Sequence, residues 1–314
     1  MTQASHQIDQ SGYGSEQYVR SISQGQILHL PKCNGWLIRR SIGFDGLDAT
    51  HAPTDLMGAY PIFQCANWHL LVEDMNALDG SAVSVALVTD PFADITPEEL
   101  RYAFPDRCFP YKRHLVADLS REPDQFISRH HRRNIKHAMK ALSFQIVAQP
   151  LPLLKPWMDL YANLIRRHAV YGMAAFSRAS FADQLAVPGM TAIVARDSTG
   201  IVGVGLWLEQ RDVCYYHLAA YNDRGYAVSA SFGIFRTAID YFRGRVQYIA
   251  FGAGPGLADN PSDGLTRFKA GWSTESRYVY FCGRILDQAA YVKLCAIRSQ
   301  PQDGPFFPSY RSAV

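Results

Sequence analysis

The chain has 314 residues, of which 48% are hydrophobic and 19% are charged, and its formal net charge is only +3. Such a chain can bury one large core or two smaller ones, and its balance of charges excludes a protein that binds nucleic acid over its whole surface. A site for a polyanion must therefore be local. No apolar run reaches the roughly 18 residues of a membrane-spanning helix.

The six cysteines are scattered, and no two of them form a Cys-x-x-Cys pair. This usage favours reduced thiols and argues against a zinc site. Residues 1–16 are polar, lack the apolar core of a secretory signal, and are expected to form a flexible tail. We therefore expect a cytoplasmic protein that binds no metal and does not span a membrane.

The first half of the chain, residues 17–119, alternates strand-like and helix-like patterns. Short apolar runs around a Pro-Lys-Cys-Asn-Gly turn predict a β-hairpin, and Thr-Pro-Glu-Glu at 96–99 is typical of a capped helix start. The expected elements are, in chain order, strands 27–30 and 35–40, helix 61–78, strand 81–89, a helix from Thr96, and strand 114–119.

A helix over 120–142 is expected to connect this half to a second half, residues 143–300, and residues 301–314 are expected to form an irregular tail. The second half is expected to contain helices 157–171 and 180–185, strands 191–196, 201–209 and 213–221, helix 229–242, strand 246–250, a glycine-rich loop 252–264 and strand 277–286. Helices followed by a meander of strands predict an α/β fold with a mixed sheet. A weaker copy of this plan in the first half suggests two similar α/β halves.

The connecting helix carries a cationic face. At about 100° per residue, its lysines and arginines share one arc of the helix and its apolar residues occupy another. The cations are Arg129, Arg132, Arg133, Lys136 and Lys140. They form either a solvated helix face or a wall that binds phosphates, for which arginine forks and lysine charges are suited. The adjacent His130 and His131 point to different faces, so we do not expect a metal site there.

The strand over 213–221 runs through a polar loop into the helix over 229–242. Helix N-termini with small residues expose backbone N–H groups that bind phosphates. The loop approximates the Arg/Gln-x-x-Gly-x-Gly/Ala motif with which acyltransferases of the GNAT fold hold a cofactor pyrophosphate, but its glycine is displaced, and the same residues also suit a simple turn. The residues that it offers to a cofactor are Arg224, Gly225, Ser229, Ala230 and Ser231.

Residues 114–286 together resemble the FemABX-like branch of the GNAT superfamily, which is built from two tandem GNAT-type halves. The matching pieces are the strand and basic helix over 118–138, the strand 215–218, Tyr-Ile-Ala-Phe-Gly at 248–252, and Gly-Leu-Thr-Arg-Phe-Lys at 264–269. The resemblance implies transfer to an amine. The transferred group is an aminoacyl group from charged tRNA, delivered to peptidoglycan precursors, or an acyl group from a thioester.

A Phe-Lys pair of this family corresponds to Phe268 and Lys269, and the resemblance implies that the lysine stabilises negative charge on a substrate phosphate or on the oxyanion. Without the family, Lys269 is interpreted as an ordinary surface lysine. His217 is either a general base or a hydrogen-bonded core histidine. The candidate catalytic residues are Lys269, His217 and Tyr216, and the candidate substrate-binding residues are Arg129, Arg132, Arg133, Lys136, Tyr221, Arg267 and Phe268.

We therefore expect an N-acyltransferase that uses acetyl-CoA or another acyl-CoA as donor and an amine on a small molecule, sugar or envelope precursor as acceptor. The first alternative is a tRNA-dependent aminoacyltransferase of peptidoglycan-type precursors. The second is a non-catalytic protein of the GNAT fold that binds tRNA or another anion. Catalysis would consist mostly of positioning and electrostatic stabilisation, with the acceptor proton lost to substrate, water or His217.

Overall fold

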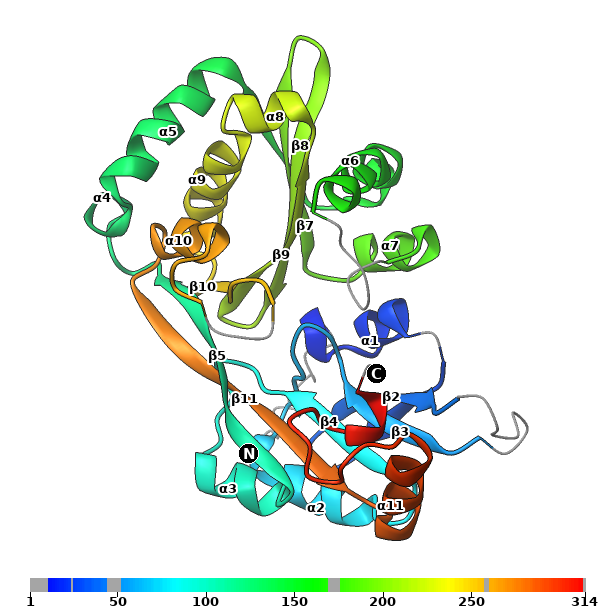
Figure 1. The fold of residues 1–314 in the computed structure, drawn as a ribbon. Helices are drawn as coiled ribbons and strands as arrows, with labels where there is room; N and C mark the ends of the chain where they lie inside the picture. The colour runs from blue at the N-terminus through cyan, green and yellow to red at the C-terminus, as the bar shows by residue number, and fades with distance from the viewer. Residues whose placement is uncertain (1–10, 24, 44–51, 169–175, 257–259, 313–314) are drawn as a thin grey trace, which may run out of the picture. The chain divides into compact units, whose positions relative to one another are not determined.

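The computed structural model describes residues 11–23, 25–43, 52–168, 176–256 and 260–312. The chain divides into two compact units (Figure 1). The first contains Tyr13–Tyr111 and the chain from Tyr278 onward, and the second contains Lys112–Arg277. Both boundaries fall inside long strands, β5 (Arg107–Asp118) and β11 (Glu275–Ile285). The predicted connecting helix over 120–142 thus falls within the second unit.

The first unit contains a mixed sheet with the strand order β1-β2-β3-β4-β11. β3 and β4 are parallel, and the other neighbouring pairs of this series are antiparallel. Its other strands are β1 (Ile27–Leu30), β2 (Gly35–Ser41), β3 (Thr54–Gly58) and β4 (Ser84–Val88). Its helices are α1 (Glu16–Ile22), α2 (Leu71–Ala77), α3 (Pro97–Ala103) and α11 (Gln288–Ile297). The hairpin β1–β2 and the capping box of α3 agree with the sequence pattern.

The second unit contains a mixed sheet with the strand order β5-β10-β9-β8-β7-β6. Figure 1 shows α6 and α7 on one face of this sheet, and α9 with α10 on the other. Its other strands are β6 (Ser143–Val147), β7 (Met190–Asp197), β8 (Gly200–Gln210), β9 (Val213–Tyr221) and β10 (Tyr248–Gly252). Its helices are α4 (Pro123–Phe126), α5 (Arg129–Ala141), α6 (Leu154–His168), α7 (Arg178–Leu185), α8 (Asp223–Ala227), α9 (Ala230–Phe242) and α10 (Gly264–Ala270).

The two central strands of the second unit are joined over a short distance only. β9 and β10 pair in parallel over Val213–Tyr215 and Tyr248–Ala250. β10 ends at Gly252, whereas β9 continues to Tyr221 and pairs with β8 along its length. From Tyr216 onward the two strands are therefore no longer joined, and the turn after β10 and the side chains of α10 can approach β9 there.

Two predicted helices differ from the structure, and the structure contains helices that the sequence pattern does not predict. The helix expected over 61–78 is confined to α2 and the 3-10 turn Trp68–Leu70 before it, because Phe63 instead donates its N–H to the carbonyl of Val88, the last residue of β4. The helix expected over 120–142 is two helices, since Ser128 ends one stretch and caps α5. The sequence pattern does not predict α10 or α11, because α10 has only seven residues and the apolar residues of α11 form no clear stripe.

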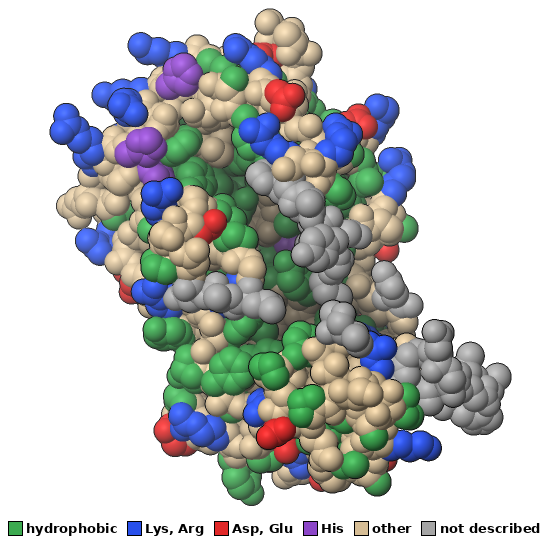
Figure 2. Space-filling model, in the orientation of Figure 1, with side chains coloured by type: hydrophobic (Ala, Val, Ile, Leu, Met, Phe, Trp, Pro, Cys, Tyr) green, Lys and Arg blue, Asp and Glu red, His purple; other side chains and the backbone are tan. Residues whose placement is uncertain are grey.

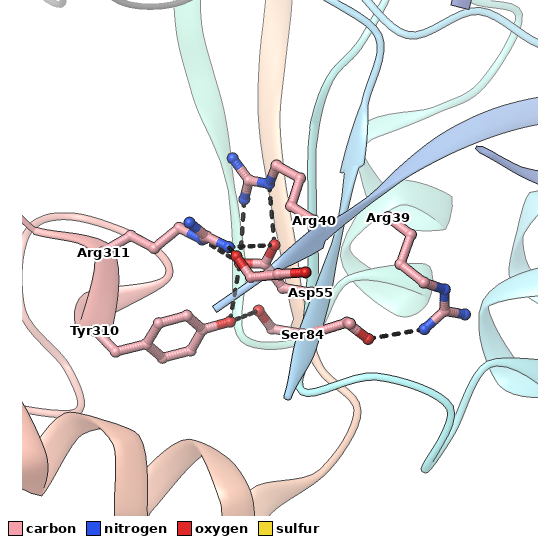
Figure 3. Close-up of polar contacts among 8 residues, drawn as sticks. Arg39, Arg40, Asp55, Ser84, Tyr310 and Arg311 are labelled. Carbon is pink, nitrogen blue, oxygen red and sulfur yellow. Dashed lines mark hydrogen bonds and ion pairs between the residues drawn. The ribbon is translucent and has the colours of Figure 1, made fainter. Parts of the chain in front are cut away.

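A buried carboxylate holds the C-terminal residues within the first unit (Figure 3). Asp55 of β3 is fully buried, and Arg40 and Arg311 form ion pairs with it at 2.9 and 2.5 Å. The Tyr310 hydroxyl donates to the same carboxylate at 3.2 Å and contacts the Ser84 hydroxyl at 2.8 Å. These donors compensate the loss of water around the buried charge. Tyr310 and Arg311 thus anchor a tail that the sequence pattern presents only as irregular.

Replacing Asp55 with alanine is expected to lower the free energy of unfolding by about 3–5 kcal/mol, because it leaves two partly buried arginines without their shared counter-ion. Urea denaturation measures this change. Glu16→Ala is the matched control, since it removes only the exposed ion pair with Arg20, and should lower the free energy by less than about 1 kcal/mol. Equal effects of the two substitutions would mean that the Asp55 cluster is not a source of stability.

Candidate functional site

Lys269 lies on α10 and its side chain is buried, with the residue only 6% exposed. Asp263 caps α10, since its carboxylate accepts hydrogen bonds from the backbone N–H groups of Leu265 and Thr266. The Lys269 Nζ donates to the Ala253 carbonyl at 2.6 Å, just after β10. The same Nζ lies 5.5 Å from the centre of the Tyr216 ring, within the range of a cation–π contact. The structure therefore brings together two of the three predicted catalytic residues.

Strand β5 adds two basic residues that the sequence analysis did not single out. Lys112 is 8% exposed, and its Nζ donates to the carbonyls of Gly254 (3.0 Å) and Gly256. His114 follows two residues later, so the two share a strand face. The signal for them in the sequence is the run Lys112-Arg113-His114, three consecutive basic residues in a strand that later becomes apolar.

Burial and like charges change the protonation of this cluster. Burial and the charge of Lys112 together lower the pKa of Lys269 to about 7, while Asp263 acts in the opposite direction. Burial, together with Lys269 and Lys112, lowers the pKa of His114 to about 3. Burial raises the pKa of the Tyr216 hydroxyl, which stays protonated. At neutral pH the site thus contains a neutral histidine, a neutral phenol and a lysine that can either give or take a proton.

His131 joins the basic helix α5 to α10. Its Nε2 lies 2.8 Å from the Phe268 carbonyl and must donate, because a carbonyl only accepts, so Nδ1 accepts from the Ser128 hydroxyl at 2.7 Å. The ring stacks on Phe268 with centroids 5.5 Å apart and meets Trp272 edge-on at 4.8 Å. Burial lowers the pKa of His131. The buried face of α5 is therefore bound directly to the residue that precedes Lys269.

The third predicted catalytic residue, His217, lies on the other side of the sheet. Tyr216 packs against Trp207 and Phe235 on the face covered by α9. The His217 Nε2 instead lies 2.9 Å from the Gln184 Oε1 of α7, and burial lowers the pKa of this histidine to about 3. This geometry favours the interpretation of His217 as a hydrogen-bonded core histidine.

The other residues predicted near Lys269 have different surroundings. Phe268 packs into the aromatic cluster of α9 and α10, with its ring 4.8 Å from that of Phe235. Arg267 is exposed on α10. Tyr221 is buried at the end of β9, where its ring lies 5.5 Å from that of Tyr226. Of these residues, Phe268 is thus the one that positions α10.

The segment predicted to hold a cofactor forms α8 and the start of α9. Arg224 forms an ion pair with Asp197 at 3.1 Å. The Gly225 N–H donates to the Asn222 side chain at 2.8 Å, and a Cβ at Gly225 would lie 2.2 Å from the Val202 carbonyl oxygen. This glycine is therefore required by the close packing of α8 on β8. The side chain of Arg224 and the N–H of Gly225 both have structural partners.

The start of α9 has no side-chain cap. Ser229, at its N-cap, has a left-handed backbone with φ of 59° and forms no side-chain capping bond. Ala230 is buried and Ser231 is partly buried in the first turn. Their backbone N–H groups are among those that a helix leaves without intrahelical partners.

The predicted cationic face of α5 is exposed. Figure 2 shows lysine, arginine and histidine side chains gathered over this helix. Its cations are Arg129, Arg132, Arg133, Lys136 and Lys140. None of the salt bridges in the described part of the chain involves them. Arg132 donates to the Asp124 carbonyl at 2.7 Å, and the face as a whole can bind phosphates.

Within the described ranges, no three His, Cys, Asp or Glu side chains are grouped so that they could hold a metal ion. The helices in those ranges also include none that is long and apolar enough to cross a membrane.

The buried histidines are expected to make stability depend on pH. The pKa of His217 is about 3 in the folded protein, against an ordinary value of 6.5. Below about pH 6.5 this histidine is therefore protonated in the unfolded chain but stays neutral in the folded one. The free energy of unfolding should therefore decrease as the pH is lowered from about 6.5, by about 1.4 kcal/mol per pH unit for each such histidine. His217→Gln should reduce this slope by one histidine's share in urea denaturation between about pH 6 and pH 4. An unchanged slope would contradict the neutral, buried state of His217.

Comparison with known proteins shows the fold. No protein-family model matches the chain, and no curated protein matches it. The C-terminal DUF2156 domain of an Agrobacterium fabrum protein named for lysylphosphatidylglycerol synthetase has a TM-score of 0.63 at 13% identity, over 89% of both chains. FemX has 0.58 at 14%, over 91% of this chain and 95% of its own, and L-PGS from Bacillus licheniformis has 0.58 at 14%, over 89% and 90%. The predicted α/β fold with a mixed sheet is confirmed, and the chain has the FemABX-like GNAT fold of these proteins.

Proposed function

We propose that this protein is an aminoacyltransferase that takes its aminoacyl group from a charged tRNA and passes it to an amine. The observation that carries the proposal is the double role of α5. One face of this helix contacts α10, which bears Lys269, through His131, and the other face exposes five cations. The fold shared with FemX and L-PGS supports this donor over the acyl-CoA expected from the sequence.

The chemistry needs one proton transfer in each direction. The acceptor amine attacks the carbonyl carbon of the aminoacyl ester, so that a C–N bond forms and the ester C–O bond to the terminal ribose breaks. The amine loses a proton and the ribose oxygen gains one. A lysine with a pKa of about 7 suits both steps: neutral Lys269 accepts the amine's proton, and the resulting ammonium stabilises the oxyanion and donates to the leaving oxygen. The phenol of Tyr216, whose ring face lies beside the Lys269 Nζ, stays protonated.

The exposed cations of α5 serve as the docking face for tRNA in this proposal. A row of arginines and lysines neutralises backbone phosphates without contacting bases specifically. This fits a tRNA donor, because all tRNAs have the same phosphate backbone. The small net charge of the chain is compatible with this, because the cations are concentrated on one helix. We also propose the cytoplasmic location expected from the sequence, where charged tRNA is available.

A thioester donor is the second candidate, and the uncapped start of α9 favours it. Free N–H groups at a helix N-terminus bind pyrophosphate, and the N-cap Ser229 leaves them without a side-chain cap. Against it, Arg224 is paired with Asp197 and the Gly225 N–H is bonded to Asn222.

The donor is tested by incubating the protein with total tRNA charged with labelled amino acids and a panel of amine acceptors. Transfer of label to an acceptor, with no release of free thiol from acetyl-CoA or longer acyl-CoAs, is the expected outcome. Thiol release with an acyl-CoA would replace the proposal by the second candidate. Tight, salt-dependent tRNA binding with no transfer would leave the non-catalytic alternative.

Lys269→Met should reduce kcat by about 100-fold or more, because it removes both the proton acceptor and the charge at the oxyanion. Methionine fills a similar volume and needs no hydrogen bond, so the variant is expected to fold. Lys155→Met, at an exposed lysine of α6, is the matched control and should leave kcat unchanged. Full activity of a folded Lys269 variant would remove this lysine from the reaction.

Neutralising the face of α5 should weaken tRNA binding and its dependence on salt. The triple variant Arg129→Gln, Arg133→Gln, Lys136→Gln is expected to reduce the slope of log Kd against log salt concentration by about 2–3. Each lost phosphate contact lowers this slope by roughly 0.7–0.9. The control triple carries Lys155→Gln, Arg178→Gln and Lys293→Gln, at exposed cations of other helices. Filter binding over a salt series measures both, and equal slopes for the two triples would return the α5 cations to the solvated-face interpretation.

A further inference from the structure

Two lysines from different elements converge on one turn of backbone in the second unit. Lys269 of α10 donates to the Ala253 carbonyl, and Lys112 of β5 donates to the carbonyls of Gly254 and Gly256. Both lysines are more than nine-tenths buried. The turn after β10 is thus held from two sides by side-chain ammonium groups.

The glycines of this turn show how closely it is enclosed. Gly252 has φ of 75° and a Cβ there would lie 3.5 Å from the Lys269 Nζ. A Cβ at Gly254 would lie 2.1 Å from the Thr266 Oγ1 of α10. A side chain at Gly254 would therefore require Thr266 to move, and the turn lies directly against α10. A change at Lys112 would be transmitted through the turn to Lys269.

The charges around Lys269 are unevenly matched. The titratable groups that act on it are Lys112 and His114 of β5, Tyr216 of β9, and Asp263 at the start of α10. Asp263 is already engaged by two backbone N–H groups as the helix cap. Within the described residues, Lys269 forms no salt bridge, and its Nζ donates a hydrogen bond to a backbone carbonyl. Carbonyl dipoles compensate a buried ammonium less fully than a carboxylate does.

We propose that Lys112 is a positioning residue for the transfer reaction: it fixes the turn after β10 and places a second positive charge beside Lys269, so that Lys269 is the lysine that exchanges a proton. The consequence for catalysis rests on the proposed function. The arrangement itself does not, because it is a property of the folded chain without substrate. Two like charges that share one buried site interact strongly enough that one proton becomes easy to remove.

A purely structural lysine would have a different signature. If Lys112 only tied the turn, its loss would lower stability without changing the proton affinity of Lys269. If its charge also acts on Lys269, then removing the charge while keeping a hydrogen-bond donor changes the proton affinity of Lys269. Replacing Lys112 with another cation should leave that affinity unchanged. Lys112→Gln and Lys112→Arg make these two changes, and Lys112→Met removes charge and donor together.

The direct test follows the titration of Lys269 by NMR in protein labelled with ¹³C at lysine Cε, with the resonance assigned through its absence in Lys269→Met. Lys112→Gln and Lys112→Met are expected to raise the midpoint by about one pH unit or more, and Lys112→Arg should keep the wild-type midpoint. Lys155→Met is the matched control for removing an exposed lysine. If Lys112→Met does not fold, Lys112→Gln and Lys112→Arg still decide the question. A midpoint in Lys112→Gln equal to that of the wild type overturns the proposal.

A second readout connects the arrangement to turnover. With a confirmed donor and acceptor, the acidic limb of kcat/KM against pH should move upward in Lys112→Gln by the same interval as the NMR midpoint. Activity near pH 6 should then fall about 10-fold and recover at higher pH, and Lys112→Arg should resemble the wild type. A uniform loss at all pH values with no displaced limb overturns the catalytic part of the proposal. If no donor supports transfer, the proposed function fails, and the NMR midpoints still test the charge of Lys112.

Discussion

The burial of an ammonium group beside the end of β10 is the constraint on which the second unit depends. The Lys269 ammonium is shielded from water. The loss of hydration is compensated by the Ala253 carbonyl and the face of the Tyr216 ring, and a second lysine contacts the same turn. Such a group is stable only where the backbone is held in place around it. Helix α10 supplies this through its Asp263 cap, through the stacking of Phe268 on His131, and through the turn that follows β10.

The buried charges of the two units have opposite kinds of surroundings. In the first, Asp55 has two arginines and a phenol around it, so its charge is matched and the cluster ties the C-terminal residues to β3. In the second, burial and the like charge of Lys112 both disfavour the charged form of Lys269. A matched buried charge is a structural feature, whereas an unmatched one titrates near neutral pH and is available for proton transfer.

In the proposed function, helix α5 links recognition to chemistry because its two faces have separate tasks. His131 on the buried face bonds to the carbonyl of Phe268, one residue before Lys269, and the cations on the opposite face remain open to solvent. A polyanionic donor bound to the outer face would therefore rest on a helix that is in direct contact with the reactive lysine's own helix. In the proposed function, this contact makes one helix serve both the body of the donor and the site of its reactive ester.

The sequence by itself determined those features that are local or periodic: the capped start at Thr96, the hairpin of β1 and β2, the two faces of α5, and the α/β class. The Phe268-Lys269 pair could be named only through the family resemblance. Only the tertiary structure showed what Tyr216 and His217 contact on the two faces of β9. It alone also placed Lys112 and His114 near Lys269, and Arg311 against Asp55. The physical reason is that burial and charge coupling depend on which distant segments meet, and a residue's spacing along the chain carries no record of its partners across the sheet.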